Sequence, residues 1–98
     1  MIETNEKYSW DSEKRELNMA DPRGLDMVEL ADAVFDDPGV VVERDDRKDY
    51  GEPRYRAFAL VNGMRVCLCF TPREGLIHII TIFQMHEKPW RKYYGDKR

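Results

Sequence analysis

The sequence predicts a single α+β domain in which helices come first and an antiparallel sheet follows. Three observations lead to this class: helical spacing of apolar residues over 25–35, a turn signal at Asn62-Gly63, and a nearly all-apolar run over 76–83. Helical and strand patterns that occupy separate parts of a chain are typical of α+β folds. With 98 residues, 42% of them hydrophobic, the chain has the size of one domain, residues 1–98.

Two helices are expected in the first half of the chain. The first begins at Asp11 or Ser12, either of which can cap it, and ends near Asp21-Pro22, because the residue before a proline avoids helical geometry. Over 25–35, apolar residues recur every three or four positions while acidic residues occupy the other side, which predicts the second helix. Asp37-Pro38-Gly39 ends it.

Four strands are expected to follow as an antiparallel meander, at 40–42, 54–61, 64–71 and 76–83. Asn62-Gly63 joins the second and third strands, and both of its residues suit the positive φ of a type I′ turn. Tyr8–Trp10 is interpreted either as a further short strand or as a staple. A short helix is expected over 88–94, where the spacing of Trp90, Tyr93 and Tyr94 favours packing on the sheet over stacking on RNA bases.

Several protein classes are excluded by composition. No apolar run approaches the roughly 18 residues needed to span a bilayer, and the first ten residues lack the apolar stretch of a secretory signal, so a cytoplasmic protein is expected. Cys67 and Cys69 point to one face of a predicted strand and are expected to be free thiols. No set of further Cys or His ligands at metal-binding spacings accompanies them, so neither a metal nor another cofactor is expected.

Charge is distributed unevenly along the chain. Residues 1–53 contain 16 Asp and Glu against 7 Lys and Arg, whereas residues 54–98 contain 3 against 9. A basic second half suits an anionic ligand such as RNA, but it equally suits the acidic first half or an acidic partner.

The order of elements and several motifs resemble the BrnT toxins of bacterial type II toxin–antitoxin systems. The similar motifs are Trp10-Asp11-x-x-Lys14, Asn18, Arg23–Met27, Ala33–Pro38, Asp45, Tyr50-Gly51-Glu52-x-Arg54, Thr71-x-Arg73 and His78–Thr81. This resemblance implies a RelE-like fold with two N-terminal helices, a four-stranded antiparallel sheet and a short C-terminal helix. It also implies metal-independent ribonuclease activity, neutralisation by a BrnA-type antitoxin, and repression of the shared promoter by the complex.

The chain departs from the family pattern at two places. Pro22-Arg23-Gly24 stands where the family usually has Lys-His-Gly. Phe83 and Gln84 stand where the family usually has arginines.

The candidate catalytic residues are Arg54, Arg73 and His78. RNA cleavage without a metal requires cations on the phosphate and groups that move protons; arginine binds phosphate through two donors, and imidazole titrates near neutral pH. The candidate RNA-binding residues are Arg56, Arg65, His86, Arg91, Lys92 and Tyr94. Each also has an ordinary structural interpretation: His78 as a hydrogen-bonded core histidine, and the arginines as members of a solvated sheet face or of ion pairs with acidic residues.

Two functions are consistent with these observations. The first is a ribonuclease toxin that acts on RNA and is held inactive by an antitoxin. The second is a catalytically inactive binding protein, for example a phage-encoded inhibitor such as an anti-CRISPR, whose acidic half occupies the nucleic-acid groove of a host complex. The long positional match favours the first, whereas the acidic first half and the altered motifs favour the second.

Overall fold

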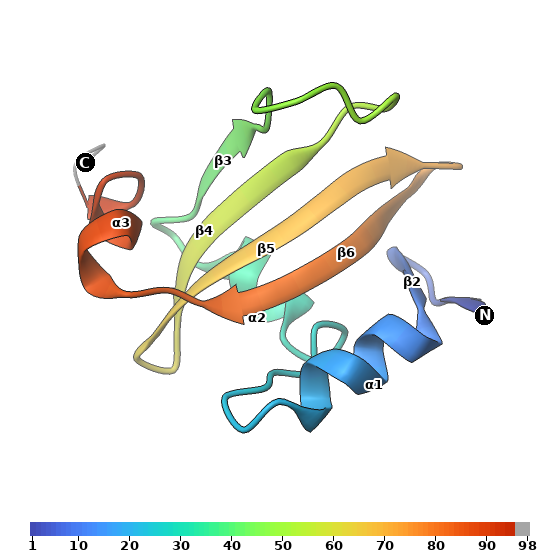
Figure 1. Ribbon diagram of the computed structural model, residues 1–98, viewed down its shortest axis with the longest axis horizontal. Helices are drawn as coiled ribbons and strands as arrows, with labels where there is room; N and C mark the ends of the chain where they lie inside the picture. Colours follow the sequence, from blue (N-terminus) through green and yellow to red (C-terminus); the bar gives the residue numbers. More distant parts are fainter. Residues whose placement is uncertain (96–98) are drawn as a thin grey trace.

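The computed structural model describes residues 1–95 and shows a six-stranded mixed sheet with three helices (Figure 1). The elements are β1 (Ile2–Thr4), β2 (Tyr8–Asp11), α1 (Ser12–Ala20), α2 (Ala31–Asp36), β3 (Val41–Arg44), β4 (Tyr55–Val61), β5 (Met64–Arg73), β6 (Leu76–Gln84) and α3 (Glu87–Arg91). The strand order is β1-β2-β6-β5-β4-β3. The predicted α+β class and short C-terminal helix are confirmed.

The predicted four-stranded antiparallel sheet is only part of the observed sheet. Strands β3 to β6 form the expected meander, but β2 pairs with β6 in parallel and β1 pairs with β2 in antiparallel fashion. The parallel pair joins residues far apart in sequence; Ser9, for example, lies opposite His78. Such long-range pairing leaves no turn signal in the sequence, which is why the prediction missed it.

The second helix is shorter than the pattern over 25–35 predicted. Its regular part, α2, has only six residues, and the segment before it forms turns. The cause is Asp26, whose carboxylate accepts hydrogen bonds from the backbone N–H groups two and three residues further on and is held by Arg15 through two bonds of 2.9 and 2.8 Å. The apolar periodicity still marks the core, because Met27 and Val34 are fully buried.

The predicted turns and the first cap are confirmed. Asn62 and Gly63 have φ of 51° and 78°, as a type I′ turn requires, and the β5–β6 turn has the same character, with φ of 53° at Glu74 and 79° at Gly75. Asp11 caps α1 by accepting a hydrogen bond from the backbone N–H of the second helical residue.

The two faces of the sheet are covered differently. The face that we call the helix face packs against α2, lies behind the sheet in Figure 1, and holds most of the core, including Leu68 and Ile79. The other face, which we call the open face, carries side chains of β4, β5 and β6 and is covered by α3 at one end only. Its residues include Arg56, Phe58, Arg65, Cys67, Cys69, Thr71, His78, Thr81 and Phe83. Sheet surface that no helix covers is therefore concentrated on one face.

Helix α3 is fastened to the sheet by aromatic residues, as their spacing predicted. Trp90 and Tyr94 are buried, and the indole Nε1 of Trp90 donates to the carbonyl oxygen of Ala59 at 3.2 Å. The hydroxyl of Tyr94 donates to Asp37 at 2.9 Å. Tyr93 stacks on Phe58 with ring centroids 4.3 Å apart.

Side chains close two strand edges that lack a strand partner. Beyond Ile79 the outer edge of β6 extends past β2, and there Asn18 of α1 accepts hydrogen bonds from the backbone N–H of Ile82 at 3.2 Å and from the hydroxyl of Thr81 at 3.1 Å. On the other side of the sheet, Asp37 accepts a bond from the backbone N–H of a β4 residue at 2.8 Å. Helix α1 thus lies along the edge of β6 rather than on a face (Figure 1).

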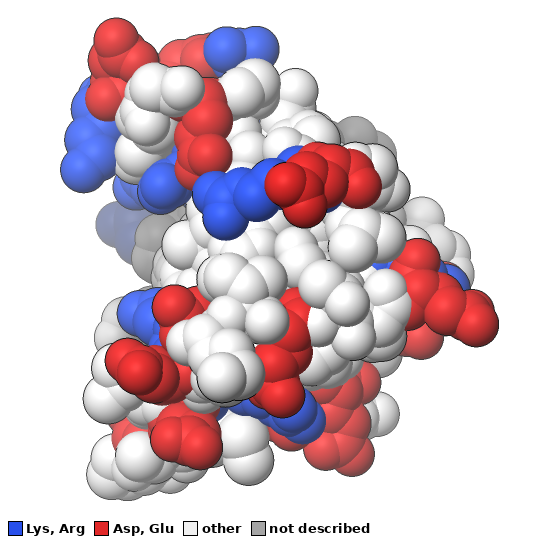
Figure 2. Space-filling model, turned by 90° about the vertical axis from the view of Figure 1, so that its right-hand side faces the viewer, with Lys and Arg blue, Asp and Glu red and all other residues white. Residues whose placement is uncertain are grey.

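Acidic side chains predominate over the lower part of the side shown in Figure 2, where α1 lies, while the visible basic side chains gather mainly in the upper part beside acidic ones.

Cys67 and Cys69 are free thiols. Within residues 1–95, no helix has the length and apolar character needed to cross a membrane.

Candidate active site

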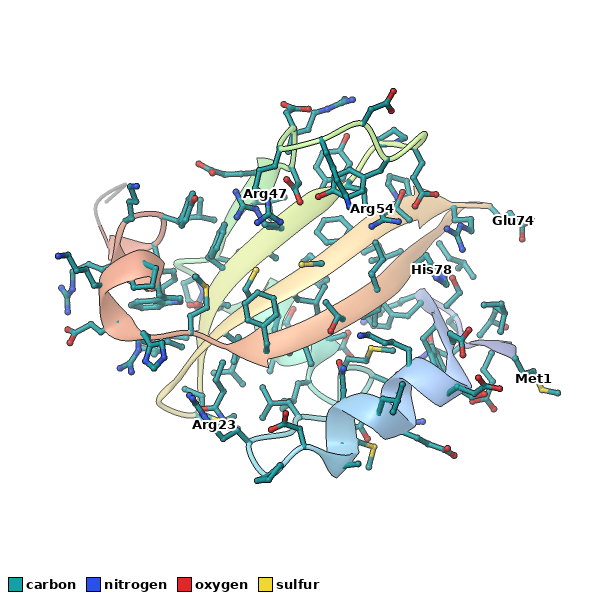
Figure 3. All side chains as sticks on the ribbon, viewed as in Figure 1. Met1, Arg23, Arg47, Arg54, Glu74 and His78 are labelled. Atoms are coloured by element: carbon teal, nitrogen blue, oxygen red, sulfur yellow. The ribbon has the colours of Figure 1, made fainter. Side chains whose placement is uncertain are left out.

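The three residues predicted to be catalytic lie together at one corner of the open face. Arg73 ends β5, His78 lies on β6 directly opposite Thr71 of β5, and Arg54 immediately precedes β4. Figure 3 shows Arg54 and His78 on the same near side of the sheet. We call Arg54, Arg73, His78 and the glutamate between the arginines, Glu52, the cationic corner.

Glu52 links the two arginines of the cationic corner. Its carboxylate oxygens accept one bond from Nε of Arg54 and one from a terminal nitrogen of Arg73, both at 3.0 Å. Because both guanidinium groups stabilise the charged form, the pKa of Glu52 lies below its ordinary value. The Arg54 guanidinium also lies 4.5 Å from the ring centroid of Tyr50. Two guanidinium groups are therefore already arranged around one anionic group, which is the arrangement that a phosphate requires.

His78 is buried, with 7% of its surface exposed, and its Nδ1 lies 2.8 Å from the hydroxyl oxygen of Ser9 on β2. Burial is the main cause that lowers its pKa, and the positive charge of Arg73 lowers it further. The imidazole is consequently neutral at pH 7, so it has a lone pair with which to accept a proton. His78 is thus both a hydrogen-bonded buried histidine and a member of the cationic corner.

The titration of His78 tests this environment. Its midpoint, measured by NMR on the free protein, is expected below the ordinary imidazole value of about 6.5. Replacing Arg73 with alanine should move the midpoint upward, because the imidazolium then loses a repelling cation. Arg44→Ala removes an exposed arginine of β3, which lies three strands away from β6, and should leave the midpoint unchanged. A wild-type midpoint at or above 6.5 would contradict the inferred environment.

The remaining predicted arginines lie elsewhere on the open face. Arg56 lies in its middle, with its guanidinium 5.2 Å from the Phe58 ring centroid and 4.9 Å from that of Tyr93. Its Nε is buried and has no hydrogen-bond partner within residues 1–95. Arg65 lies at the opposite end from the cationic corner, where its Nε donates to the carbonyl oxygen of Met85 at 3.1 Å.

The predicted RNA-binding residues of the tail have unequal access to solvent. His86, Arg91 and Lys92 are exposed on and around α3, and Arg91 forms an ion pair with Glu87 within the helix. Tyr94 is buried, so in the free protein its ring packs rather than offering a face to a base. The structure does not bring these residues together with the cationic corner.

Sequence reasoning missed several members of the site. Glu52 lies in the Tyr50–Arg54 motif but was not among the predicted site residues. Ser9 reaches His78 only through the parallel β2–β6 pair. The mixed-charge loop before β4 also contains a buried carboxylate: Asp45 is buried, and its pKa lies well below the usual range because Arg47 donates two bonds of 2.8 Å to it. Within residues 1–95 no group of three or more His, Cys, Asp or Glu side chains could hold a metal ion.

The comparison with protein families decides the affiliation of this chain. The family model described as the ribonuclease toxin BrnT of type II toxin–antitoxin systems matches residues 10–88. The chain belongs to the BrnT family. No curated protein and no solved structure gives a match. The protein is therefore a ribonuclease toxin of a type II toxin–antitoxin system, which implies an RNA substrate and an antitoxin partner.

The family assignment bears on the two functions that the sequence left open. The match is to the toxin, the first of them. All four residues of the cationic corner of this BrnT protein lie within the matched range, which runs from residue 10 to residue 88.

Proposed function

We propose that this BrnT protein cleaves RNA without a metal ion, that the cationic corner is its active site, and that the scaffold is RelE-like. The observation that supports the site is the joint position of Arg54, Glu52 and Arg73 beside the neutral His78. A mixed sheet whose meander carries a short C-terminal helix is consistent with the proposed scaffold.

The scissile phosphate is proposed to bind between Arg54 and Arg73 in place of the Glu52 carboxylate. Both guanidinium groups already donate to that carboxylate at 3.0 Å, so little rearrangement is needed to bind another anion of similar shape. Their charge stabilises the extra negative charge that the phosphate acquires in the transition state. Glu52 acts as a positioning residue that keeps the two arginines in place before RNA arrives.

His78 is proposed to act as the general base. With Nδ1–H donating to the Ser9 hydroxyl, Nε2 carries the lone pair and accepts the proton of the ribose 2′-hydroxyl. The 2′ oxygen then forms a bond to phosphorus while the bond from phosphorus to the 5′ oxygen breaks. The leaving 5′ oxygen takes up a proton from solvent. The products are a 2′,3′-cyclic phosphate and a 5′-hydroxyl end.

The rest of the RNA is proposed to cross the open face towards α3. Arg56 lies in the middle of this route, and Arg65, His86, Arg91 and Lys92 lie at its far end. Tyr94 is assigned a supporting role, because it fastens α3 to Asp37. A BrnA-type antitoxin is proposed to neutralise the toxin by covering this route.

Product analysis in the presence of a chelator tests the proposal. Purified protein incubated with labelled RNA and excess EDTA should cleave at the same rate as without EDTA, because the proposed mechanism uses no metal. The cleaved ends should carry 2′,3′-cyclic phosphate and 5′-hydroxyl groups. Loss of cleavage with EDTA, or 5′-phosphate ends, would rule out the mechanism. The Arg54→Ala, Arg73→Ala double variant is the matched inactive control.

A further inference from the structure

A groove of about 280 Å³ lies between the C-terminal part of α1 and the outer edge of β6. Its lining includes Asn18 and Arg23 from α1 and the loop that follows it, and Phe83 and Gln84 from β6. Figure 3 shows Arg23 below the C-terminal end of β6, with His78 toward the beginning of the same strand. The volume lies just below the roughly 300–1,000 Å³ of sites for drug-sized molecules, so it suits a ligand fragment of one ring system.

The groove offers hydrogen-bonding groups whose directions are fixed by the fold. Asn18 must turn Oδ1 towards β6, because the backbone N–H of Ile82 can only donate. Its amide nitrogen therefore points away from the strand, and it donates no hydrogen bond to any residue that the structure describes. Gln84 donates through Nε2 to the carbonyl oxygen of Arg23 at 3.4 Å, which leaves its Oε1 as an acceptor. One donor and one acceptor of this kind match the edge of a nucleobase.

An aromatic residue, Phe83, also lines the groove. Phe83 is 43% exposed, although phenylalanine usually belongs to the core. It lies on the open face, opposite Cys67 of β5. It lies five positions along β6 from His78, which corresponds to about 16 Å, a distance that a short run of nucleotides covers. An RNA strand whose phosphate is bound at the cationic corner therefore reaches this ring.

We propose that the groove is a nucleobase site for single-stranded RNA, in which one base stacks on Phe83 while Asn18 and Gln84 contact its edge. Arg23, which is exposed at the rim, contacts the adjoining phosphate. Asp21 also lines the groove, and an acidic residue there favours a base that carries an amino group over uracil. This inference rests on the proposed function, since it assumes that RNA crosses the open face. The polar residues of the lining, and the position of the groove on the strand that also carries His78, favour RNA over a protein segment.

Binding of a labelled RNA tests the site directly. The probe is a fluorescein-labelled single-stranded RNA of about ten nucleotides, with 2′-O-methyl riboses that prevent cleavage. Its anisotropy is measured against the full-length protein at several salt concentrations. Phe83→Ala should weaken binding about tenfold, as expected for loss of one stacked base, without changing the salt dependence. Phe83→Trp should restore the affinity, because it keeps an aromatic face.

Two controls separate the possible failures. Leu60→Ala removes a different exposed apolar side chain, one that lies on β4 and is 44% exposed. This variant should bind RNA like the wild type. The Arg54→Ala, Arg73→Ala double variant should lose affinity and show a flatter salt dependence. If the wild type binds no RNA, the proposed function itself fails. If only the double variant weakens binding, the function stands and the base site is overturned. A Phe83→Ala variant that keeps RNA affinity but loses affinity for the purified cognate antitoxin would assign the groove to a protein contact, which also overturns the proposal.

Discussion

Replacing His78 with alanine is expected to slow RNA cleavage by about 10²–10⁴-fold, the usual contribution of a general base. The reason is that Nε2 of His78 is the proposed acceptor of the 2′-hydroxyl proton, and a neutral imidazole is available for this at pH 7. RNA affinity should change little, since the phosphate is bound by Arg54 and Arg73. The measurement is single-turnover cleavage of a labelled RNA, combined with binding of the 2′-O-methyl probe.

The Ser9→Ala variant is the matched comparison for this experiment. It keeps the imidazole and removes only the hydroxyl that lies 2.8 Å from Nδ1, so its rate should lie between those of the wild type and His78→Ala. Wild-type cleavage by a correctly folded His78→Ala protein would show that His78 is a structural histidine and that the base is another group.

Replacing Phe58 with alanine is expected to lower the free energy of unfolding by about 3–5 kcal/mol. Phe58 is fully buried on the open face beneath α3, where its ring stacks on Tyr93. The substitution leaves a cavity and removes the platform on which the tail helix packs. Because a small domain has only about 5–15 kcal/mol of stability, this one change brings the protein close to its unfolding threshold. Urea unfolding monitored by far-UV circular dichroism measures the effect.

Phe83→Ala deletes the same ring at an exposed position and is the natural control. Its effect on the unfolding free energy should stay within about 0.5 kcal/mol, as for most surface substitutions. Similar losses in both variants would mean that the packing of α3 contributes little to stability. A large loss in Phe83→Ala alone would mean that the groove beside β6 belongs to the core.

Local signals in the sequence predicted the local structure well. Asn62-Gly63 indicated a turn because these two residue types tolerate the positive φ that a type I′ turn requires. Asp11 indicated a helix start because its side chain replaces a missing backbone acceptor. Long-range pairing was beyond such signals: β1 is entirely exposed and shows no alternation, and the β2–β6 pair joins residues as far apart in sequence as Ser9 and His78. The second helix was overestimated because apolar periodicity cannot reveal that Asp26 is engaged by Arg15.

The candidate site was predictable as a set of residue types but not as a geometry. Arg54 and Arg73 could be selected because cations bind phosphate, yet nothing local indicated that one glutamate joins them. The role of Ser9 depends on a pair that is distant in sequence, and the orientation of Asn18 depends on the unpaired edge of β6. Tyr94 shows the opposite case, because its spacing already indicated packing and the structure places it in the core.

The closure of strand edges by Asn18 and Asp37 has a consequence for behaviour at high concentration. An unpaired strand edge attracts a second chain and leads to aggregation. In this sheet the longest strands, β5 and β6, are paired with neighbours or capped by an amide, so that short, charged strands remain at the outside: β1 with Glu3 and β3 with Glu43 and Arg44. The toxin thus keeps one wide face of its sheet open while offering little edge along which its own copies could polymerise.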